Sequence, residues 1–159
     1  MKTQPPTHFT AYCTAEGADV KVADDVALVV DALKRYVAAR LQKKGVTVAW
    51  QPDPENAQLS LRLTRIDRSN QFLRCVPFGH FFGAPCVAVE GQLSLPDAGP
   101  VVFRYERVSY RTWYWSGWGG SAEIVLATCC KLLARDIAKS VHQCLEGAQI
   151  LKGLKDDNA

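Results

Sequence analysis

The sequence predicts an α+β domain in which a mixed sheet with an antiparallel meander carries two long helices on one face. In two long segments, apolar residues recur at three- and four-residue steps, which is typical of amphipathic helices. Five shorter segments are predicted strands, and in the later ones apolar residues alternate with polar residues, which is typical of strands with one buried face. The order is β-α-β-β-β-β-α. A chain of 159 residues with 48% apolar and 22% charged residues suits one such domain.

The first predicted strand covers residues 8–14, and a helix follows it. Asp24 or Asp25 offers an N-cap to this helix, which explains two adjacent carboxylates at its start. Gly45 is placed to end the helix at the C′ position. The apolar residues that define its buried face are Val26, Val29, Val30, Leu33, Val37 and Leu41.

Four further strands are predicted. A short one covers residues 46–50, and period-two alternation marks residues 59–64 and 87–95. The last covers residues 101–112, where the apolar positions change from odd to even numbers. This change of phase predicts a β-bulge near Glu106–Arg107.

The closing helix is predicted to begin after Ser121, a favourable N-cap, and to stop at Gly147. We therefore expect a single domain over residues 8–147, with flexible termini at 1–7 and 148–159. The apolar stripe of this helix consists of Leu126, Cys130, Leu133, Ile137, Val141 and Cys144.

Two aromatic, glycine-bearing segments interrupt this plan at residues 72–86 and 111–120, and together they hold three of the four tryptophans and four of the six phenylalanines. If the last three strands form an antiparallel meander, both segments leave the sheet at the same end. Because surface loops are normally polar, this concentration of aromatic residues predicts a single apolar tip.

This tip is the predicted binding site, for a protein partner or for a second copy of the chain. Exposed apolar patches commonly mark such sites, and Trp and Tyr also favour membrane interfaces, so contact with a membrane surface is the alternative. A third reading has the tryptophans fold back to fill the core, although alternation places Trp113 and Trp115 on one strand face and Tyr114 on the other. The predicted binding residues are Phe78, His80, Phe81, Phe82, Trp113, Tyr114, Trp115 and Trp118.

The order of parts resembles an uncharacterised family of small bacterial envelope lipoproteins, a domain-of-unknown-function family. The matching segments are Ala57–Leu61, Phe78–Gly83, Val87–Leu93 and Leu133–Val141. The closing helix is also similar to the last helix of the TolB amino-terminal domain and of the curli-secretion-channel lipoprotein. The resemblance implies a cell-envelope accessory or assembly protein that is not an enzyme. The chain departs from the family in having no lipobox, in its bulky aromatic turn and in lacking an aspartate at position 58.

Six cysteines are many for a reducing cytosol. Cys75 and Cys86 bracket the first aromatic turn, and a disulfide between them would close a loop of about 12 residues and contribute about 3 kcal/mol. The alternative is two independent thiols, and a thiol-dependent redox protein using this pair is a third hypothesis for function. A Cys13–Cys129 bridge is a further option, whereas Cys130 suits the core.

The remaining patterns argue against other classes. Cys75, His80 and Cys86 lack a fourth ligand, so no metal and no cofactor are predicted. Neither G-x-S-x-G nor H-E-x-x-H occurs, and the formal net charge of +3 is too small to favour nucleic acid. No signal peptide is recognisable. We therefore expect a periplasmic or envelope location if a leader has been removed, and a cytoplasmic one otherwise.

Overall fold

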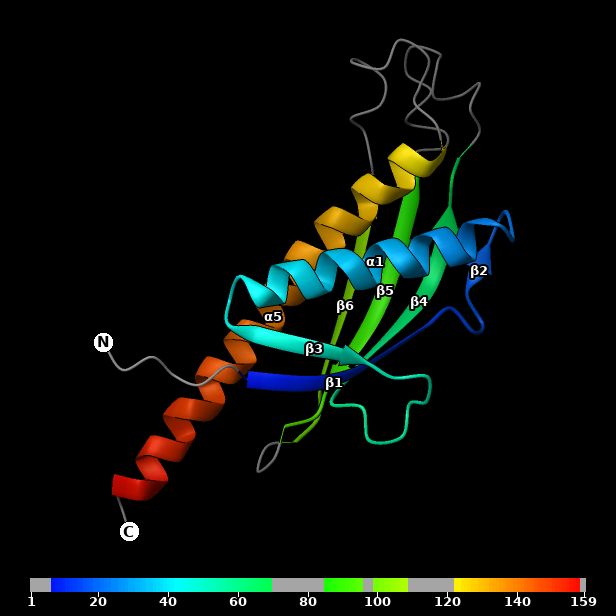
Figure 1. Cartoon of the computed structure of the whole chain (residues 1–159). Coiled ribbons are helices and arrows are strands. Elements are labelled where there is room, and N and C mark those ends of the chain that lie inside the picture. The colour runs from blue at the N-terminus through cyan, green and yellow to red at the C-terminus, as the bar shows by residue number, and fades with distance from the viewer. Residues whose placement is uncertain (1–6, 70–84, 96–98, 109–121, 158–159) are drawn as a thin grey trace.

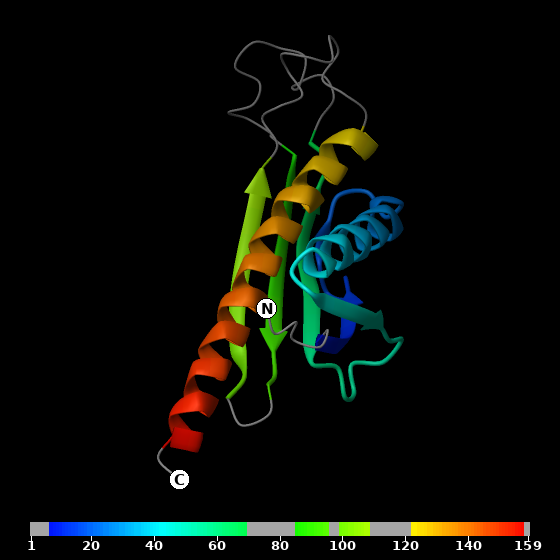
Figure 2. The same cartoon turned by 60° about the vertical axis from the view of Figure 1, so that its left-hand side comes forward.

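A computed structural model describes residues 7–69, 85–95, 99–108 and 122–157. It confirms the predicted α+β class, because a six-stranded mixed sheet carries two helices on one face (Figure 1 and Figure 2). The elements in chain order are β1 (Thr7–Thr14), β2 (Asp19–Val20), α1 (Asp25–Gln42), β3 (Val46–Trp50), β4 (Leu59–Asp67), β5 (Cys86–Leu93), β6 (Val101–Val108) and α5 (Ala122–Asp157).

The strand order in the sheet is β3-β1-β4-β5-β6, and the short β2 pairs with β4. β1 runs parallel to both β3 and β4, whereas β4, β5 and β6 form the predicted antiparallel meander. The sequence left the placement of the first strands open, and the structure puts β1 between β3 and β4. The two-residue β2 is too short to show an alternation pattern and is therefore missed by sequence reasoning.

The predicted bulge near Glu106–Arg107 is wrong. β5 and β6 pair without interruption from Leu93↔Val101 to Cys86↔Val108, and the register shift lies instead between Leu63 and Arg65, where β4 pairs with β5. The apolar phase of β6 changes because Arg107 occupies an inward position and binds Asp136. A polar residue on the core-facing side therefore mimics a bulge in the sequence pattern.

The core lies between the sheet and the two helices, which also pack against each other. The predicted buried faces are confirmed by fully buried residues from each layer, such as Leu33 of α1, Leu61 of β4 and Leu133 of α5. The predicted end of the closing helix at Gly147 is wrong, because α5 continues to Asp157. An interior glycine costs a helix only about 1 kcal/mol, which is not enough to end one. The domain limits of 8–147 and the flexible termini stay predictions.

None of the helices in the described part of the chain is both long and apolar enough to span a bilayer.

Gly91 on β5 leaves no room for a side chain. It lies opposite Phe103 of β6, and a Cβ atom at Gly91 would stand 2.1 Å from Cε2 of the Phe103 ring. Gly91→Val should therefore displace an aromatic ring that packs on the core and lower the free energy of unfolding by about 1–3 kcal/mol. Urea unfolding measures this change.

The matched control for this prediction is Gly99→Ala, because a Cβ at Gly99 meets nothing within 4 Å. This control should change stability by less than about 0.5 kcal/mol. Equal changes in the free energy of unfolding for the two substitutions would show that the Phe103 ring can move aside without loss of stability.

Candidate functional site

All eight predicted binding residues, together with Cys75, lie outside the described residues, which stop at residue 69 and resume at 85, and stop at 108 and resume at 122. The described chain ends that border these segments do meet. Asp67 pairs with Cys86, and Cys86 pairs with Val108, so the end of β4, the start of β5 and the end of β6 form one row across the sheet. The first turn of α5 lies at the same end (Figure 1). The described residues that border the two aromatic segments therefore lie at one end of the sheet.

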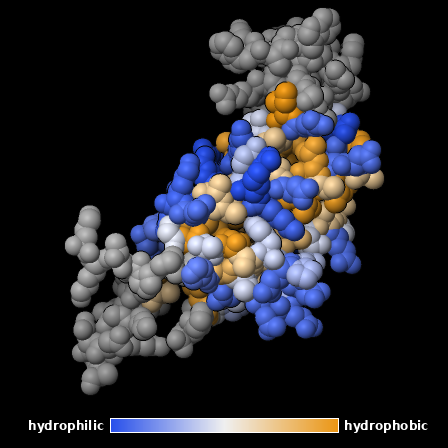
Figure 3. All heavy atoms as spheres, viewed as in Figure 1, coloured by the Kyte–Doolittle hydropathy of each residue, from blue (hydrophilic) through white to orange (hydrophobic). Residues whose placement is uncertain are grey.

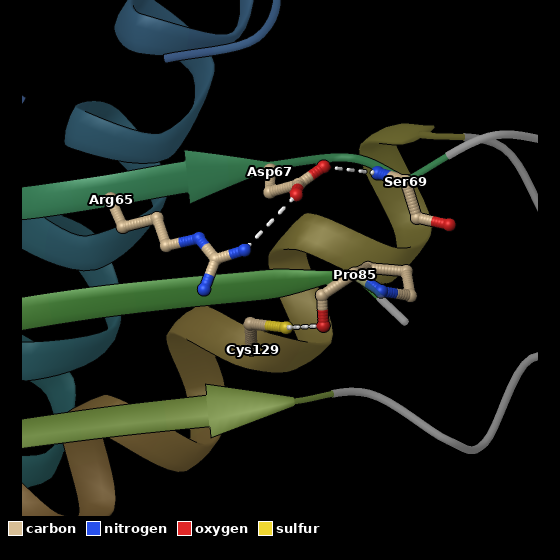
Figure 4. Close-up of polar contacts among 5 residues, drawn as sticks. All are labelled: Arg65, Asp67, Ser69, Pro85 and Cys129. Carbon is tan, nitrogen blue, oxygen red and sulfur yellow. Dashed lines mark hydrogen bonds and ion pairs between the residues drawn. The ribbon is translucent and has the colours of Figure 1, made fainter. Parts of the chain in front are cut away.

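The border after β4 is organised by the Asp67 carboxylate (Figure 4). Its Oδ1 accepts a hydrogen bond of 2.8 Å from the backbone N–H of Ser69, and its Oδ2 lies 3.4 Å from Nη2 of Arg65. Ser69 has a φ of +63°, a left-handed conformation that non-glycine residues adopt infrequently. The Asp67 side chain thus fixes the turn by which the chain leaves the sheet.

Arg68, within the same turn, is anchored to α1. Its Nε and Nη2 donate to the two carboxylate oxygens of Asp25 at 2.8 and 2.5 Å, a bidentate ion pair. Asp25 is only 2% exposed, and its hydrogen bond raises the pKa of Arg68 above the usual range. Asp24 occupies the N-cap position of α1, as predicted, but the side-chain capping bond expected there is not formed. Asp25 binds Arg68 instead.

The border after β6 has an equivalent anchor on α5. Arg107 donates from Nε to Oδ2 of Asp136 at 2.5 Å, and two residues earlier Tyr105 makes a hydrogen bond to Ser140. The bond to Asp136, a buried carboxylate, raises the pKa of Arg107. Each aromatic segment therefore begins four residues after an arginine that is bound to a carboxylate on a helix.

Sequence reasoning missed both ion pairs, although a polar residue at an expected apolar position indicates the pair between Arg107 and Asp136. Asp136 stands between Leu133 and Ile137 on the apolar stripe of the closing helix, where a carboxylate requires a partner. Arg107 takes the position at which the next apolar residue of its strand is expected. The pairing of the two residues, which are 29 positions apart, is not readable from the pattern.

The thiols at this end of the molecule are buried. Cys86 is 3% exposed and free, so the predicted disulfide with Cys75 is not confirmed. Cys129 points its sulfur at the carbonyl oxygen of Pro85 at 3.7 Å (Figure 4), and Cys13 is also free, so the Cys13–Cys129 bridge is wrong. Burial, followed by a hydrogen bond to Glu106, raises the pKa of Cys86 to about 12. Because the thiolate is the nucleophile, Cys86 is poorly suited to thiol chemistry near neutral pH.

The surface beside the tip is apolar in part. Ile124, in the first turn of α5, is 58% exposed, although a large apolar side chain in an amphipathic helix normally faces the core. Figure 3 shows a mostly hydrophilic face on which hydrophobic residues gather toward the same upper end. The described residues thus carry apolar surface up to the border of the aromatic segments.

The helix-free face of the sheet is polar by comparison. A hollow of about 410 Å³ lies there, lined by residues that include Thr64, Glu90, Arg104 and Glu106. Arg104 and Glu90 form an ion pair at 3.2 Å across β5 and β6. Pairs between exposed charges are worth little in free energy, so this face is a solvated sheet surface rather than a built site.

No family model matches the chain, and no curated protein matches it. Among solved structures, it is similar to PelC from Paraburkholderia phytofirmans, a dodecamer, with 15% identity over 84% of this chain and 93% of that chain at a TM-score of 0.43. It is also similar to protein XCC0632 from Xanthomonas campestris, of family DUF330, with 11% identity over 100% and 93% at a TM-score of 0.42.

A third similar structure is a candidate lipoprotein from Caulobacter crescentus, with 15% identity over 89% of this chain and 91% of that chain at a TM-score of 0.41. All three likenesses are distant, with TM-scores below 0.5, so the function of this chain does not follow from them. The similarity of the closing helix to TolB and to the curli lipoprotein stays an expectation.

Proposed function

We propose that this chain is a non-enzymatic accessory module of the cell envelope that docks a protein partner through its aromatic tip. The tip consists of the eight aromatic and histidine residues predicted in segments 72–86 and 111–120. The observation that carries the proposal is the row Asp67–Cys86–Val108, which joins the borders of both segments at one end of the sheet. The envelope location rests on the family resemblance of the sequence.

The anchored borders support a docking role in energetic terms. Aromatic residues, tryptophan above all, supply much of the binding energy at protein interfaces. Ordering a loop on binding costs free energy, and a site held in place beforehand avoids part of that cost. The ion pairs of Arg68 and Arg107 hold the last described residues before each segment against the helices. The tip is therefore presented from a rigid base.

A photo-crosslinking amino acid at Trp115 should test the docking role in cells that naturally make the protein. We expect a discrete crosslinked adduct at this position, because the tip contacts a partner. The same group at Ala49, an exposed position on β3, is the matched control and should give none. Identical adduct patterns at Trp115 and Ala49 would contradict docking through the tip.

Contact with a membrane surface is the alternative, favoured by the three tryptophans of segment 111–120. Co-sedimentation with vesicles of mixed zwitterionic and anionic lipids separates the two. The proposal predicts no sedimentation with vesicles. Sedimentation that is lost in the double variant Trp115→Ala, Trp118→Ala would instead establish the membrane role.

A further inference from the structure

β6 is an edge strand of the sheet. Among the described residues its eight positions pair only with β5, so its outer row of backbone N–H and C=O groups has no strand beside it. Such an edge is a template for another strand, and proteins usually protect it with charges, bulges or a covering element. α5 contacts β5 and β6 from one face of the sheet rather than from this edge (Figure 2).

The sequence of β6 is complementary to itself about Tyr105. If a second β6 lies antiparallel with Tyr105 opposite Tyr105, each Arg104 faces a Glu106, and each Val102 faces a Val108. Directly opposite residues in an antiparallel pair point to the same face and interact. The Arg104 side chain is 77% exposed despite its ion pair with Glu90, so it has room for a second carboxylate. Val102, at 55% exposure, gains an apolar neighbour.

We propose that two copies of this chain pair through β6 in this register, about a two-fold axis, to form one continuous sheet. The inference goes beyond tip docking, because it uses a different surface and does not require the tip. The proposed dimer also fixes where its two tips lie relative to each other. The two-fold axis would place the tips at opposite ends of the dimer, so that one dimer presents two docking sites.

The helices fit this arrangement. Neighbouring strands lie about 4.8 Å apart, so a helix lying over β5 and β6 would stand about 10 Å from its symmetry mate. That separation is the usual distance between packed helices, which is about 8–10 Å. The opposite edge strand, β3, has five residues and no charged side chain, so it offers no comparable complementarity. The charge pattern therefore points to β6 and to a second copy as its occupant.

Sedimentation velocity on the full chain tests the pairing. The wild-type chain should sediment with twice the 17.5 kDa mass of one chain. Glu106→Arg sets Arg104 against a new arginine at two symmetric positions and should weaken the dimer by roughly tenfold or more. Within its own chain residue 106 lies opposite Ala88, but the variant also loses the hydrogen bond to Cys86 and places an arginine two residues from Arg104 on the same strand face. Its unfolding free energy is therefore measured beside its sedimentation. Glu16→Arg, the same charge change at an exposed turn, should leave the dimer intact.

The triple variant Glu90→Gln, Arg104→Glu, Glu106→Arg restores opposite charges across the dimer and leaves no carboxylate opposite the new glutamate, because Glu90 faces position 104. It should regain the dimer, with circular dichroism confirming that each variant is folded. Amide exchange in residues 101–108 should also slow as the concentration of wild-type protein rises, because the outer N–H groups become paired. A wild-type monomer at all concentrations, or a Glu106→Arg dimer as strong as wild type, would overturn the proposal. So would loss of the dimer in the Trp115→Ala, Trp118→Ala variant alone, since self-association would then use the tip.

Discussion

Asp25→Ala is expected to lower the free energy of unfolding by about 2–3 kcal/mol. The change leaves the Arg68 guanidinium without its bidentate partner at the start of α1. Breaking a buried ion pair from one side typically costs 3–5 kcal/mol. The Arg68 side chain is 36% exposed, so water screens part of the loss and brings the expected cost below that range. Urea unfolding at neutral pH measures the change.

Asp24→Ala is the matched control for the loss of the Arg68 partner. Asp24 carries the same charge one residue earlier and makes no side-chain capping bond. We expect it to change stability by less than about 0.5 kcal/mol. If both alanine variants lose the same stability, the effect arises from charge near the helix N-terminus and not from the pair with Arg68.

Stability is expected to fall steeply as the pH rises above 9. Burial raises the pKa of Cys13 from 9.0 to about 11, and it raises the pKa values of Cys86 and Cys130 from 9.0 to about 12. Between pH 9 and 11 the unfolded chain loses these protons while the folded chain keeps them. Unfolding therefore releases protons, and the stability present below pH 9 is lost as pH rises toward the folded pKa.

The size of this alkaline effect follows from the number of thiols. Each thiol contributes up to about 1.4 kcal/mol per pH unit inside its window, so three contribute about 4 kcal/mol per pH unit at most. Urea unfolding at a series of pH values from 8 to 11 gives the slope. Cys130→Ala should reduce that slope by about one third, because lysines and tyrosines titrate alike in both proteins. An unchanged slope in the variant would show that Cys130 ionises in the folded state.

The fold could be predicted from the sequence where burial alone decides the pattern. The alternation of Leu59, Leu61 and Leu63 and the helical spacing of Leu126, Leu133 and Ile137 depend only on which face meets the core, and the structure buries all of them. The three consecutive strands were predicted to form an antiparallel meander, and the structure pairs them in that way. Such patterns are local, so one sequence is enough to read them.

Two of the failures share a cause that is not local. The pattern predicts a break in strand phase at Arg107 and a helix cap at Asp25, because their partners lie 29 and 43 positions away. A polar residue on an inward face is explained only by the group that it meets in three dimensions. The same holds for the parallel pairing of β1 between β3 and β4, which no spacing in the sequence specifies.

The two proposed surfaces, the edge of β6 and the aromatic tip, have complementary roles. The edge of β6 joins two copies, and the borders anchored by Arg68 and Arg107 present one aromatic tip from each copy. A partner with two equivalent sites would then bind the dimer more tightly than a single chain, provided that both tips can engage at once.

Docking through the tip requires that the two aromatic segments form one surface at one end of the sheet. Nuclear Overhauser effects between selectively labelled phenylalanine rings and tryptophan indoles test this requirement most directly. We expect contacts that join Phe78, Phe81 or Phe82 to Trp113, Trp115 or Trp118, beyond those within each segment. If each set of rings shows contacts only within its own segment or with the core, the two segments do not share a surface and the proposed docking tip does not exist.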